Sequence, residues 1–366
     1  MSRPRILVGM SGGVDSSLSA ALLLEQGYEV VGGFIKNWSD SKDLWTGECE
    51  WRGERRDALR VAAKLGISLL TFDFEAQYRE RVLGRMFAEY ERGLTPNPDV
   101  LCNEEIKFGL FFEAAMKAGF DGVATGHYAQ VTRDEEGIAH LLKGIDTEKD
   151  QSYFLYRLSQ EVLQKVYFPI GHLEKSQVRI EAAKRAIPTA MKPDSQGICF
   201  IGKLDFHEFL RKKIPAVPGE IVSETGEVLG IHDGLDAYTI GQRQGLRLSA
   251  GGKTWYVAAK DKALHRLIVV DRHDHPMLYH KEALLGDLHW TRDVKKDAEQ
   301  SHWTVEAAIR YRQSPQEAKA TLAADKKTLH LQFVEPVWAL APGQSAVLYQ
   351  GTECLGGGVL LDSLSP

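Results

Sequence analysis

Residues 11–16 read S-G-G-V-D-S and lie between an apolar run, R-I-L-V-G-M, and a helical pattern from Asp15 to Gln26. Adjacent glycines at the start of a helix present backbone N–H groups, and the hydroxyls of Ser11, Ser16 and Ser17 add further donors around an anion. No lysine follows the glycines, which excludes a Walker-type loop, and the dinucleotide fingerprint G-x-G-x-x-G is also absent. The stretch predicts an anion-binding loop, with an unliganded glycine turn as the alternative.

Two cysteine-containing stretches also carry side chains that do chemistry. The first is N-P-D-V-L-C-N at residues 97–103, and the second is D-S-Q-G-I-C-F-I at residues 194–201. The prolines and asparagine before Cys102 predict a turn-rich loop, and Gly197 lets the backbone near Cys199 approach a neighbour closely. Two loop cysteines far apart in the sequence can exchange a disulfide if they meet in space.

Asp99 and the remaining cysteines have plainer interpretations. Asp99 lies three residues before Cys102 and directly after a proline, which is typical of a turn-stabilising residue. Cys49 and Cys354 are expected to pack as small hydrophobic side chains.

The anion-binding loop needs a strand before it and a helix after it, and the first third of the chain contains several such pairs. Apolar runs alternate with helical patterns, three of which are closed by Gly27, Gly66 and Gly119. This alternation predicts a parallel sheet covered on both faces, with ligands beyond the carboxyl ends of its strands. The expected strands are 5–10, 28–35, 67–74 and 121–126, and the expected helices are 15–26, 52–65, 75–92 and 104–118.

Beyond about residue 205 the pattern changes to short runs separated by turns. A short helix is expected over Lys203–Lys213, and the turn signals E-T-G-E, H-D-G-L and A-G-G-K indicate a small β-rich domain. Alternation in W-T-V-E-A-A-I-R-Y-R and T-L-H-L-Q-F-V then indicates a β-barrel or sandwich. We divide the chain into a catalytic domain at 1–203, a central β-rich adaptor domain at 204–280 and a C-terminal β-barrel at 281–366.

The 366 residues carry a net charge of −5, with 43% hydrophobic and 26% charged residues. This composition is ordinary for a globular protein and argues against a non-specific nucleic-acid coat, although it leaves room for a local basic surface. We find no signal peptide and no apolar stretch of membrane-spanning length, and the scattered cysteines do not indicate a disulfide framework. We therefore expect a cytoplasmic protein with no membrane partner.

The motifs taken together resemble a known family. The S-G-G-V-D-S loop closely resembles the PP-loop of the N-type ATP pyrophosphatases, and with the two cysteine stretches the chain resembles the tRNA-specific 2-thiouridylases. The resemblance also includes T-G-H-Y at 125–128, K-D-Q-S-Y-F-L at 149–155, Y-T-I-G-Q-R-Q-G-L at 238–246, R-Y-R at 310–312 and P-G-Q at 342–344. It implies the α/β fold class: a parallel-sheet, Rossmann-like PP-loop domain, then a small β-rich domain and a C-terminal β-barrel.

The resemblance also implies ATP and Mg²⁺ as cofactors and assigns three groups of residues. The catalytic group is Asp99, Cys102 and Cys199. The ATP-binding group is Gly9, Met10, Ser11, Gly12, Gly13, Val14, Asp15, Ser16, Ile35 and Gly126. The tRNA-binding group is Asn97, Pro98, Asp99, His127, Lys149, Asp150, Gln151, Arg310, Tyr311 and Gln344.

The implied reaction is ATP-dependent 2-thiolation of the wobble uridine in tRNAs for lysine, glutamate and glutamine. AMP attached to the 2-oxygen makes it a good leaving group, and a persulfide on Cys199 then attacks C2. Cys102 releases the sulfur by forming a disulfide with Cys199, and Asp99 acts as general acid/base beside the base. Nearby positive charge or a helix terminus is expected to lower the thiol pKa values. The implied partners are tRNA and a persulfide sulfur-relay protein or cysteine desulfurase.

An acidic protein still needs basic side chains at RNA phosphates. The candidates are Lys175, Arg179, Lys184 and Arg185 on one expected helix, Arg243 and Arg247 beside a glycine-rich turn, and Arg310 and Arg312 on one face of an expected strand. An ordinary solvated face is the alternative for the helix cluster.

Three other functions fit parts of the pattern. An amidating synthetase of the PP-loop group would not need the pair of cysteines. An iron–sulfur-dependent tRNA thiolase would use Asp99, Cys102 and Cys199 as cluster ligands, although the absence of a C-x-x-C pair argues against a zinc or four-cysteine site. A non-catalytic tRNA-binding or sulfur-carrier protein would not need the intact anion-binding loop.

Overall fold

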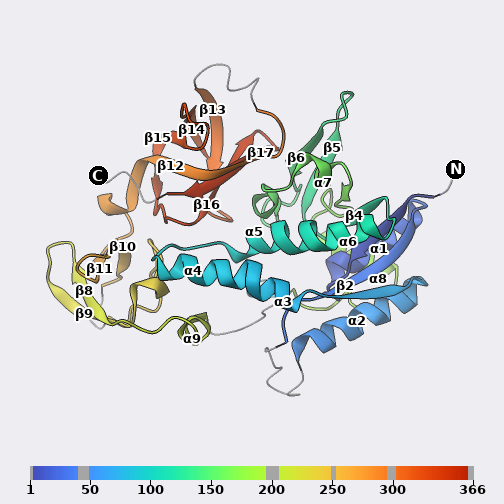
Figure 1. Cartoon of the computed structure of the whole chain (residues 1–366), viewed down its shortest axis with the longest axis horizontal. Helices are drawn as coiled ribbons and strands as arrows, with labels where there is room; N and C mark the ends of the chain where they lie inside the picture. Colours follow the sequence, from blue (N-terminus) through green and yellow to red (C-terminus); the bar gives the residue numbers. More distant parts are fainter. Residues whose placement is uncertain (1–2, 40–48, 195–205, 249–252, 295–301, 362–366) are drawn as a thin grey trace.

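The computed structural model describes residues 3–39, 49–194, 206–248, 253–294 and 302–361. Figure 1 shows three bodies in chain order: an α/β domain, a small β domain and a β-barrel that packs beside the first. This arrangement confirms the predicted fold class.

The α/β domain is built on a five-stranded parallel sheet, as the alternation of apolar runs and helices predicts. In β1 the side chains alternate between two cores, since Ile6 and Val8 pack with α1 and α2 whereas Leu7 packs with the helical run 98–117. The sheet is therefore covered on both faces. Its strands, in the order β3-β2-β1-β4-β7, are Leu69–Asp73, Glu29–Lys36, Arg5–Gly9, Gly122–Ala124 and Val166–Tyr167.

The helices of this domain end close to their expected positions. Gly66 is a left-handed C-cap with φ of 70°, and its N–H bonds the carbonyls of Ala62 and Ala63. Two π-helical segments, η1 (Tyr78–Gly84) and η2 (Asn103–Leu110), join shorter helices into continuous runs. The helices are α1 Val14–Glu25, α2 Glu50–Leu65, α3 Glu75–Gln77, α4 Arg85–Glu91, α5 Pro98–Cys102, α6 Phe111–Lys117, α7 Gln160–Leu163 and α8 Lys175–Lys184.

The central domain follows a short helix, α9 (Phe206–Arg211), which lies inside the range expected for it. Its four-stranded sheet has the order β10-β11-β8-β9, with Leu267, Val269 and Ile221 in its core. The strands are β8 Gly219–Ser223, β9 Val228–His232, β10 Tyr256–Asp261 and β11 Arg266–Val270. The predicted small β-rich domain is confirmed.

Six C-terminal strands form a closed barrel, because β12 pairs with both β15 and β17. Closure leaves no free strand edge around the barrel. The strands, in barrel order, are β12 Tyr279–Trp290, β15 Leu329–Trp338, β14 Gln316–Leu322, β13 Trp303–Ala308, β16 Ser345–Gln350 and β17 Glu353–Leu360.

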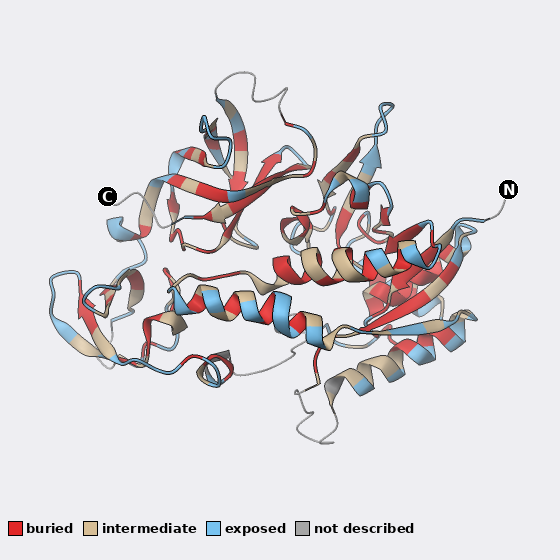
Figure 2. Ribbon diagram, viewed as in Figure 1, coloured by how far each residue is buried: buried red, intermediate tan, exposed pale blue. Residues whose placement is uncertain are grey.

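The barrel and the α/β domain share a sheet and a core. A hairpin that the sequence did not reveal, β5 (Ala129–Arg133) and β6 (Ala139–Lys143), leaves the α/β domain and pairs with β17 of the barrel. Tyr153 of the α/β domain donates from its hydroxyl to the Ser345 carbonyl at 2.7 Å. Figure 2 shows buried residues in the sheet, along α5 and α6 and inside the barrel. These contacts fix the orientation of the two domains relative to each other.

The cysteines outside the expected active site differ from each other. Cys354 lies at the β6–β17 junction, and its burial raises the pKa of its thiol to about 12, so it packs as predicted. Cys49 is half-buried and its Sγ donates to the Ser39 carbonyl at 3.1 Å, so the expectation of simple hydrophobic packing was wrong there. Within the described ranges, no helix is long and apolar enough to cross a membrane.

The junction between hairpin and barrel gives a pH-dependent prediction. His140 Nδ1 lies 2.7 Å from Glu353 and Nε2 lies 3.1 Å from Asp134, and the bond to Glu353 raises the pKa of His140 above 6.5. A raised histidine pKa stabilises the fold below the unfolded pKa, and this contribution is lost as pH rises through the folded pKa. We expect His140→Gln to lower the melting temperature at about pH 6 and to have much less effect at about pH 9.

The matched control is His330→Gln, which removes an exposed pair with Glu282 on the barrel surface. Surface pairs contribute little, so this variant should follow the wild type at each pH. Equal destabilisation by His140→Gln at both pH values would show that its charge plays no part at the junction.

Candidate functional site

A cavity of about 790 Å³ opens at the carboxyl ends of β1, β2 and β4, where ligands bind in parallel sheets. Most of the predicted ATP group lines it, together with four members of the predicted tRNA group besides Asp99. The predicted residues in its wall are Gly9, Met10, Ser11, Gly13, Val14, Asp15, Ser16, Ile35, Asp99, Gly126, His127, Lys149, Gln151 and Tyr311. The geometry thus brings one continuous site together from segments up to 300 residues apart.

The S-G-G-V-D-S loop turns directly from β1 into α1. The Ser11 N–H donates to Ser16 Oγ at 3.2 Å, and both hydroxyls lie in the cavity wall. Ser17 differs, because it is fully buried, donates to the Gly13 carbonyl at 2.6 Å and accepts from Thr189. The expectation that Ser17 joins the anion-binding ring was therefore wrong; its hydroxyl fixes the loop from behind.

Gly12 makes the loop possible, although it does not line the cavity. Its φ is +75°, and an added Cβ would collide with the Glu54 carbonyl of α2. We expect Gly12→Ala to reduce ATP affinity at least about tenfold, because the loop must shift to relieve the overlap. Gly27→Ala is a matched control, since Gly27 also has a positive φ (+89°) but open space around it. Equal ATP affinities in the two variants, measured by calorimetry, would contradict this role.

A lysine does reach the loop, but from a distant helix. Lys175, the first residue of α8, places Nζ 2.8 Å from both carboxylate oxygens of Asp15. The Tyr128 hydroxyl also donates to Asp15 Oδ1 at 2.8 Å, and burial followed by the Asp15 charge raises the pKa of Tyr128. Lys175 of α8 thus supplies the positive charge that a Walker loop has within its own sequence.

Carboxylates neutralise the basic cluster that was expected to bind RNA. Asp194 lies 2.9 Å from Lys175, 2.7 Å from Arg179 and 3.1 Å from Lys149. Lys184 pairs with Glu181, and Arg185 pairs with Glu25 and Glu181. The helix therefore does not present a bare cationic face, which favours the alternative of an ordinary solvated face; contact with RNA stays a prediction.

The N-P-D-V-L-C-N stretch starts a helix instead of forming a loop. Asn97 caps α5, since its side chain accepts from the backbone N–H groups of Asp99 and Val100 at 3.2 and 3.3 Å, and Pro98 occupies the first turn. Asparagine before proline is a strong start signal for a helix, which explains why the turn-rich loop predicted for Cys102 was wrong. Asp99 lies in the first turn of α5 and lines the cavity.

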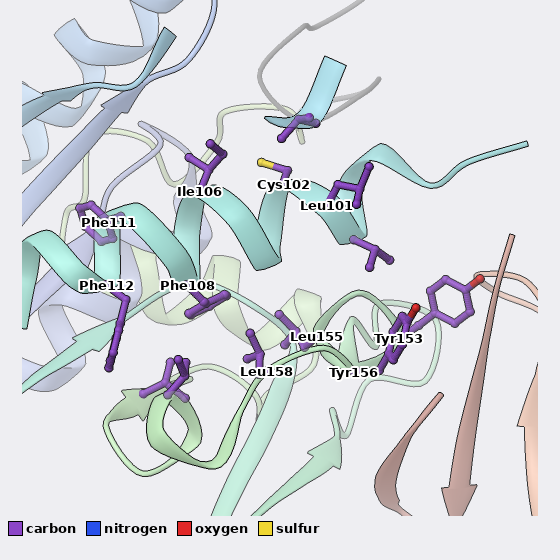
Figure 3. Packing of buried hydrophobic residues seen from close by; sticks show 14 of the residues in the cluster. Leu101, Cys102, Ile106, Phe108, Phe111, Phe112, Tyr153, Leu155, Tyr156 and Leu158 are labelled. Carbon is purple, nitrogen blue, oxygen red and sulfur yellow. The ribbon is translucent and has the colours of Figure 1, made fainter. Parts of the chain in front are cut away.

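Cys102 lies on the first turns of this helical run and is fully buried. Figure 3 shows Cys102 and Ile106 on one side of the helix, with Tyr153, Leu155, Tyr156 and Leu158 on the other. Cys199, its expected partner, lies outside the described residues.

The segment after β4 packs against the loop. An added Cβ on Gly126 would lie 2.6 Å from the Ser16 nitrogen, so Gly126 allows this close approach. His127 is 7% exposed; its Nδ1 lies 2.7 Å from Thr125 Oγ1 and its Nε2 lies 3.4 Å from Lys107 Nζ. Burial, followed by the Lys107 charge, lowers the pKa of His127 well below its ordinary value.

Residues 149–151 are held by local bonds. The buried Asp150 carboxylate accepts from the N–H groups of Gly144 and Ser152, and Gln151 accepts from the Tyr128 N–H. Lys149 and Gln151 line the cavity, whereas Asp150 fixes the turn.

Comparison with known proteins gives full-length relatives. A protein of Enterococcus faecalis is 47% identical over 98% of this chain and 96% of its own length, and one of Methylobacillus flagellatus is 47% identical over 99% and 100%; both are named tRNA-specific 2-thiouridylase MnmA. The chain belongs to the tRNA-specific 2-thiouridylase family.

Matches to three domain families cover most of the chain. Residues 4–203 match a family described as the tRNA methyl transferase HUP domain, residues 207–271 a PRC-barrel domain and residues 280–360 an aminomethyltransferase β-barrel domain. A solved NMN synthetase from Francisella tularensis is 17% identical, with a TM-score of 0.35 over 57% of this chain and 72% of its own. This last likeness is too remote to bear on function.

Three residues of the expected tRNA-binding group, Arg310, Tyr311 and Gln344, lie on the barrel side of the site. Tyr311 lines the cavity and its ring lies 4.3 Å from that of Phe154. Gln344 donates to the Thr95 carbonyl at 2.7 Å and so braces the segment that leads to Asn97. Arg310 donates to the carbonyls of Ile240 and Ala339, which joins the barrel to the central domain.

Arg310 and Arg312 lie in the connection after β13 and not on a strand, so their predicted common strand face was wrong. The chain turns there because Arg312 adopts a left-handed conformation with φ of 65°. Arg312 lines the cavity and stacks on Tyr311, whereas Arg310 is directed to backbone carbonyls.

Several cavity residues were not identified from the sequence. They come from elements that become neighbours only in the fold. Trp51 and Lys107 lie in no quoted motif, Tyr128, Phe154 and Asp194 lie in quoted motifs without an assigned role, and Lys175 was assigned to RNA. The main ones are Trp51, Lys107, Tyr128, Phe154, Lys175 and Asp194.

Proposed function

We propose that this chain is an ATP-dependent tRNA-uridine 2-sulfurtransferase that forms AMP and pyrophosphate. The observation that carries the proposal is the single cavity shared by the S-G-G-V-D-S loop and Asp99, in a full-length member of the 2-thiouridylase family. The proposed target is the wobble uridine of tRNAs for lysine, glutamate and glutamine. An unpaired anticodon base enters such a cavity without the cost of opening a duplex.

The loop is proposed to hold the pyrophosphate of ATP. Ser11, Ser16 and the loop N–H groups are donors at a helix start, and Lys175 supplies positive charge. Ile35 and Met10 offer apolar surface for the adenine. The Asp15 carboxylate is a hard oxygen ligand in the cavity wall, which fits Mg²⁺ bound by one carboxylate and phosphate oxygens. The ion would supply further neutralisation of the leaving pyrophosphate.

The first chemical step is proposed to be adenylation. The uridine 2-oxygen forms a bond to the α-phosphorus while the bond from the α-phosphorus to the bridging oxygen breaks, and pyrophosphate leaves with the electron pair. The N3 proton of the uridine passes to the Asp99 carboxylate. The product is a uridine whose C2–O bond is primed for cleavage.

Sulfur transfer is proposed to follow on the two cysteines. The terminal sulfur of a Cys199 persulfide attacks C2 and AMP leaves, which joins Cys199 to the base through two sulfurs. Cys102 then attacks the Sγ of Cys199, which forms the Cys102–Cys199 disulfide and releases the thiocarbonyl as N3 regains its proton. A thiol reductant restores the dithiol, and a persulfide relay protein or cysteine desulfurase recharges Cys199.

The proposal is tested in one reaction that contains ATP, Mg²⁺, a persulfide donor, a thiol reductant and unmodified tRNA. We expect 2-thiouridine by nucleoside analysis, with AMP formed in equal amount. Thiolation without AMP would refute the function, and visible absorbance of anaerobically purified protein would favour an iron–sulfur thiolase instead.

A further inference from the structure

On its barrel side, the cavity is lined by an arginine in a backbone conformation that arginine rarely adopts. Residues 310–313 form a turn, closed by a hydrogen bond of 3.2 Å from the Gln313 N–H to the Arg310 carbonyl. Arg312 is the third residue of this turn and has φ of 65°, a conformation that favours glycine or asparagine. Backbone strain of this kind is typical of a residue retained for the function of its side chain.

The guanidinium of Arg312 is exposed and lies in the cavity wall. In the part of the chain that the structure describes, no hydrogen bond or ion pair engages it, and it lies 5.3 Å from the centre of the Tyr311 ring. Lys149 and Lys175, two other cations of the wall, both pair with the Asp194 carboxylate. The charge of Arg312 therefore remains available to an anion that enters from solvent.

Two aromatic rings form the wall next to this arginine. The ring centroids of Phe154 and Tyr311 lie 4.3 Å apart, and both residues line the cavity and are only partly buried. The backbone of Phe154 is held on both sides, because its carbonyl accepts from Asn103 Nδ2 at 3.4 Å and its N–H donates to the Gln151 carbonyl at 3.0 Å. Part of each ring therefore faces the cavity from a fixed position.

Aromatic rings beside an unpaired arginine fit a nucleotide of single-stranded RNA. Bases that are splayed out of RNA loops stack on aromatic side chains, and the planar guanidinium binds phosphate through two parallel donors. The anion-binding loop belongs to the α/β domain, whereas Arg312 is an exposed residue of the barrel. This placement favours an RNA phosphate over an ATP phosphate as the partner of Arg312.

We propose that Phe154, Tyr311 and Arg312 form a second nucleotide subsite. The two rings stack on the base next to the target uridine, and Arg312 binds the phosphate that joins these two nucleotides. This inference rests on the proposed function, in which the target base lies beside Asp99 in the same cavity. Phosphate contacts set the register of a nucleic acid on a protein, so the subsite determines which base of the loop enters the cavity.

The first test measures tRNA affinity at several salt concentrations for Arg312→Gln. We expect binding to weaken about three- to tenfold, and the slope of the logarithm of the binding constant against the logarithm of salt concentration to fall by about 0.7, as for one phosphate of a single strand. The matched control is Lys326→Gln, because Lys326 is also basic, exposed and left-handed (φ 57°) but does not line the cavity. It should retain the wild-type affinity and slope.

Two results of this test would overturn the inference. The first is an unchanged tRNA affinity and salt dependence in Arg312→Gln. The second is slower AMP formation at saturating tRNA with unchanged tRNA affinity, which would assign the guanidinium to a phosphate of ATP.

The second test separates the side chain of Arg312 from its backbone conformation. Glycine adopts a φ of 65° without strain, so Arg312→Gly should retain the turn and melt no lower than Arg312→Gln. We expect its tRNA affinity and salt dependence to match those of Arg312→Gln, because both variants lack the guanidinium. Wild-type tRNA binding by Arg312→Gly would reject the phosphate contact.

The third test examines stacking with anticodon stem–loop RNAs in which the nucleotide on one side or the other of the target uridine is abasic. We expect wild type to bind one of these two RNAs about 5- to 100-fold more weakly than the intact RNA, and Tyr311→Leu to bind it no more weakly than wild type does. Tyr279→Leu, which removes a partly buried ring of the barrel outside the cavity wall, should show the wild-type pattern. Losses that multiply for both abasic RNAs would reject the stacking.

These results are distinguishable from failure of the proposed function. If the wild type forms no AMP from ATP and unmodified tRNA, the function fails whatever the binding data show. If the wild type forms AMP and Arg312→Gln matches its tRNA affinity and salt dependence, the inference alone fails.

Discussion

Cys199→Ser is expected to abolish thiolation from a persulfide donor while pyrophosphate still forms and AMP stays linked to the tRNA. Serine cannot carry the terminal sulfur, so no nucleophile reaches the adenylated C2, and 2-thiouridine should fall by at least about 10³-fold, the scale seen on removal of a catalytic nucleophile. Adenylation should persist because the loop and Asp99 are unchanged. The measurement is nucleoside analysis beside pyrophosphate release in one reaction.

Cys102→Ser should stop the reaction one step later. With enzyme persulfidated in advance, the variant should accumulate a tRNA–protein adduct that a thiol reductant cleaves, because nothing attacks the Sγ of Cys199. Cys49→Ser is the control, since serine retains the donor that contacts the Ser39 carbonyl. Full multiple-turnover thiolation by Cys102→Ser would remove the resolving cysteine from the scheme.

Asp99→Asn is expected to slow adenylation itself, by about 10²- to 10⁴-fold, because the amide cannot accept the N3 proton. The fold should be unaffected, since Asn97 and not Asp99 caps the helix. The rate of AMP formation at saturating ATP and tRNA measures the effect, and the melting temperature reports on folding. Glu113→Gln, an exposed substitution on the same helical run, is the matched control. A variant that forms AMP normally but fails to thiolate would move Asp99 from adenylation to sulfur transfer.

The parts of the fold that depend on local pattern were predictable. The strand–loop–helix unit around Gly12 and Gly13, the parallel sheet and the barrel follow from apolar periodicity and from glycines at turns. The hairpin β5–β6 was missed because its partner, β17, lies some 210 residues further along the chain. Its two short strands give no distinct strand pattern in the sequence taken alone.

The functional site likewise contains residues that the sequence pattern predicts and residues that only the fold brings together. The loop and Asp99 lie in motifs and were found from the sequence, whereas Lys175 and Lys107 line the cavity from helices whose sequences look like ordinary charged surface. The N-cap role of Asn97 also shows how a proline-containing stretch that suggests a turn instead starts a helix. Such residues are identified by tertiary position and not by spacing.

The central claim is that the uridine 2-oxygen is linked to AMP before sulfur replaces it. The most direct measurement uses tRNA that carries ¹⁸O at C2 of the target uridine and follows the label by mass spectrometry of the released nucleotide. We predict one ¹⁸O atom in AMP for each 2-thiouridine formed. Thiolated tRNA with unlabelled AMP, and the ¹⁸O in water or inorganic phosphate, would contradict the account.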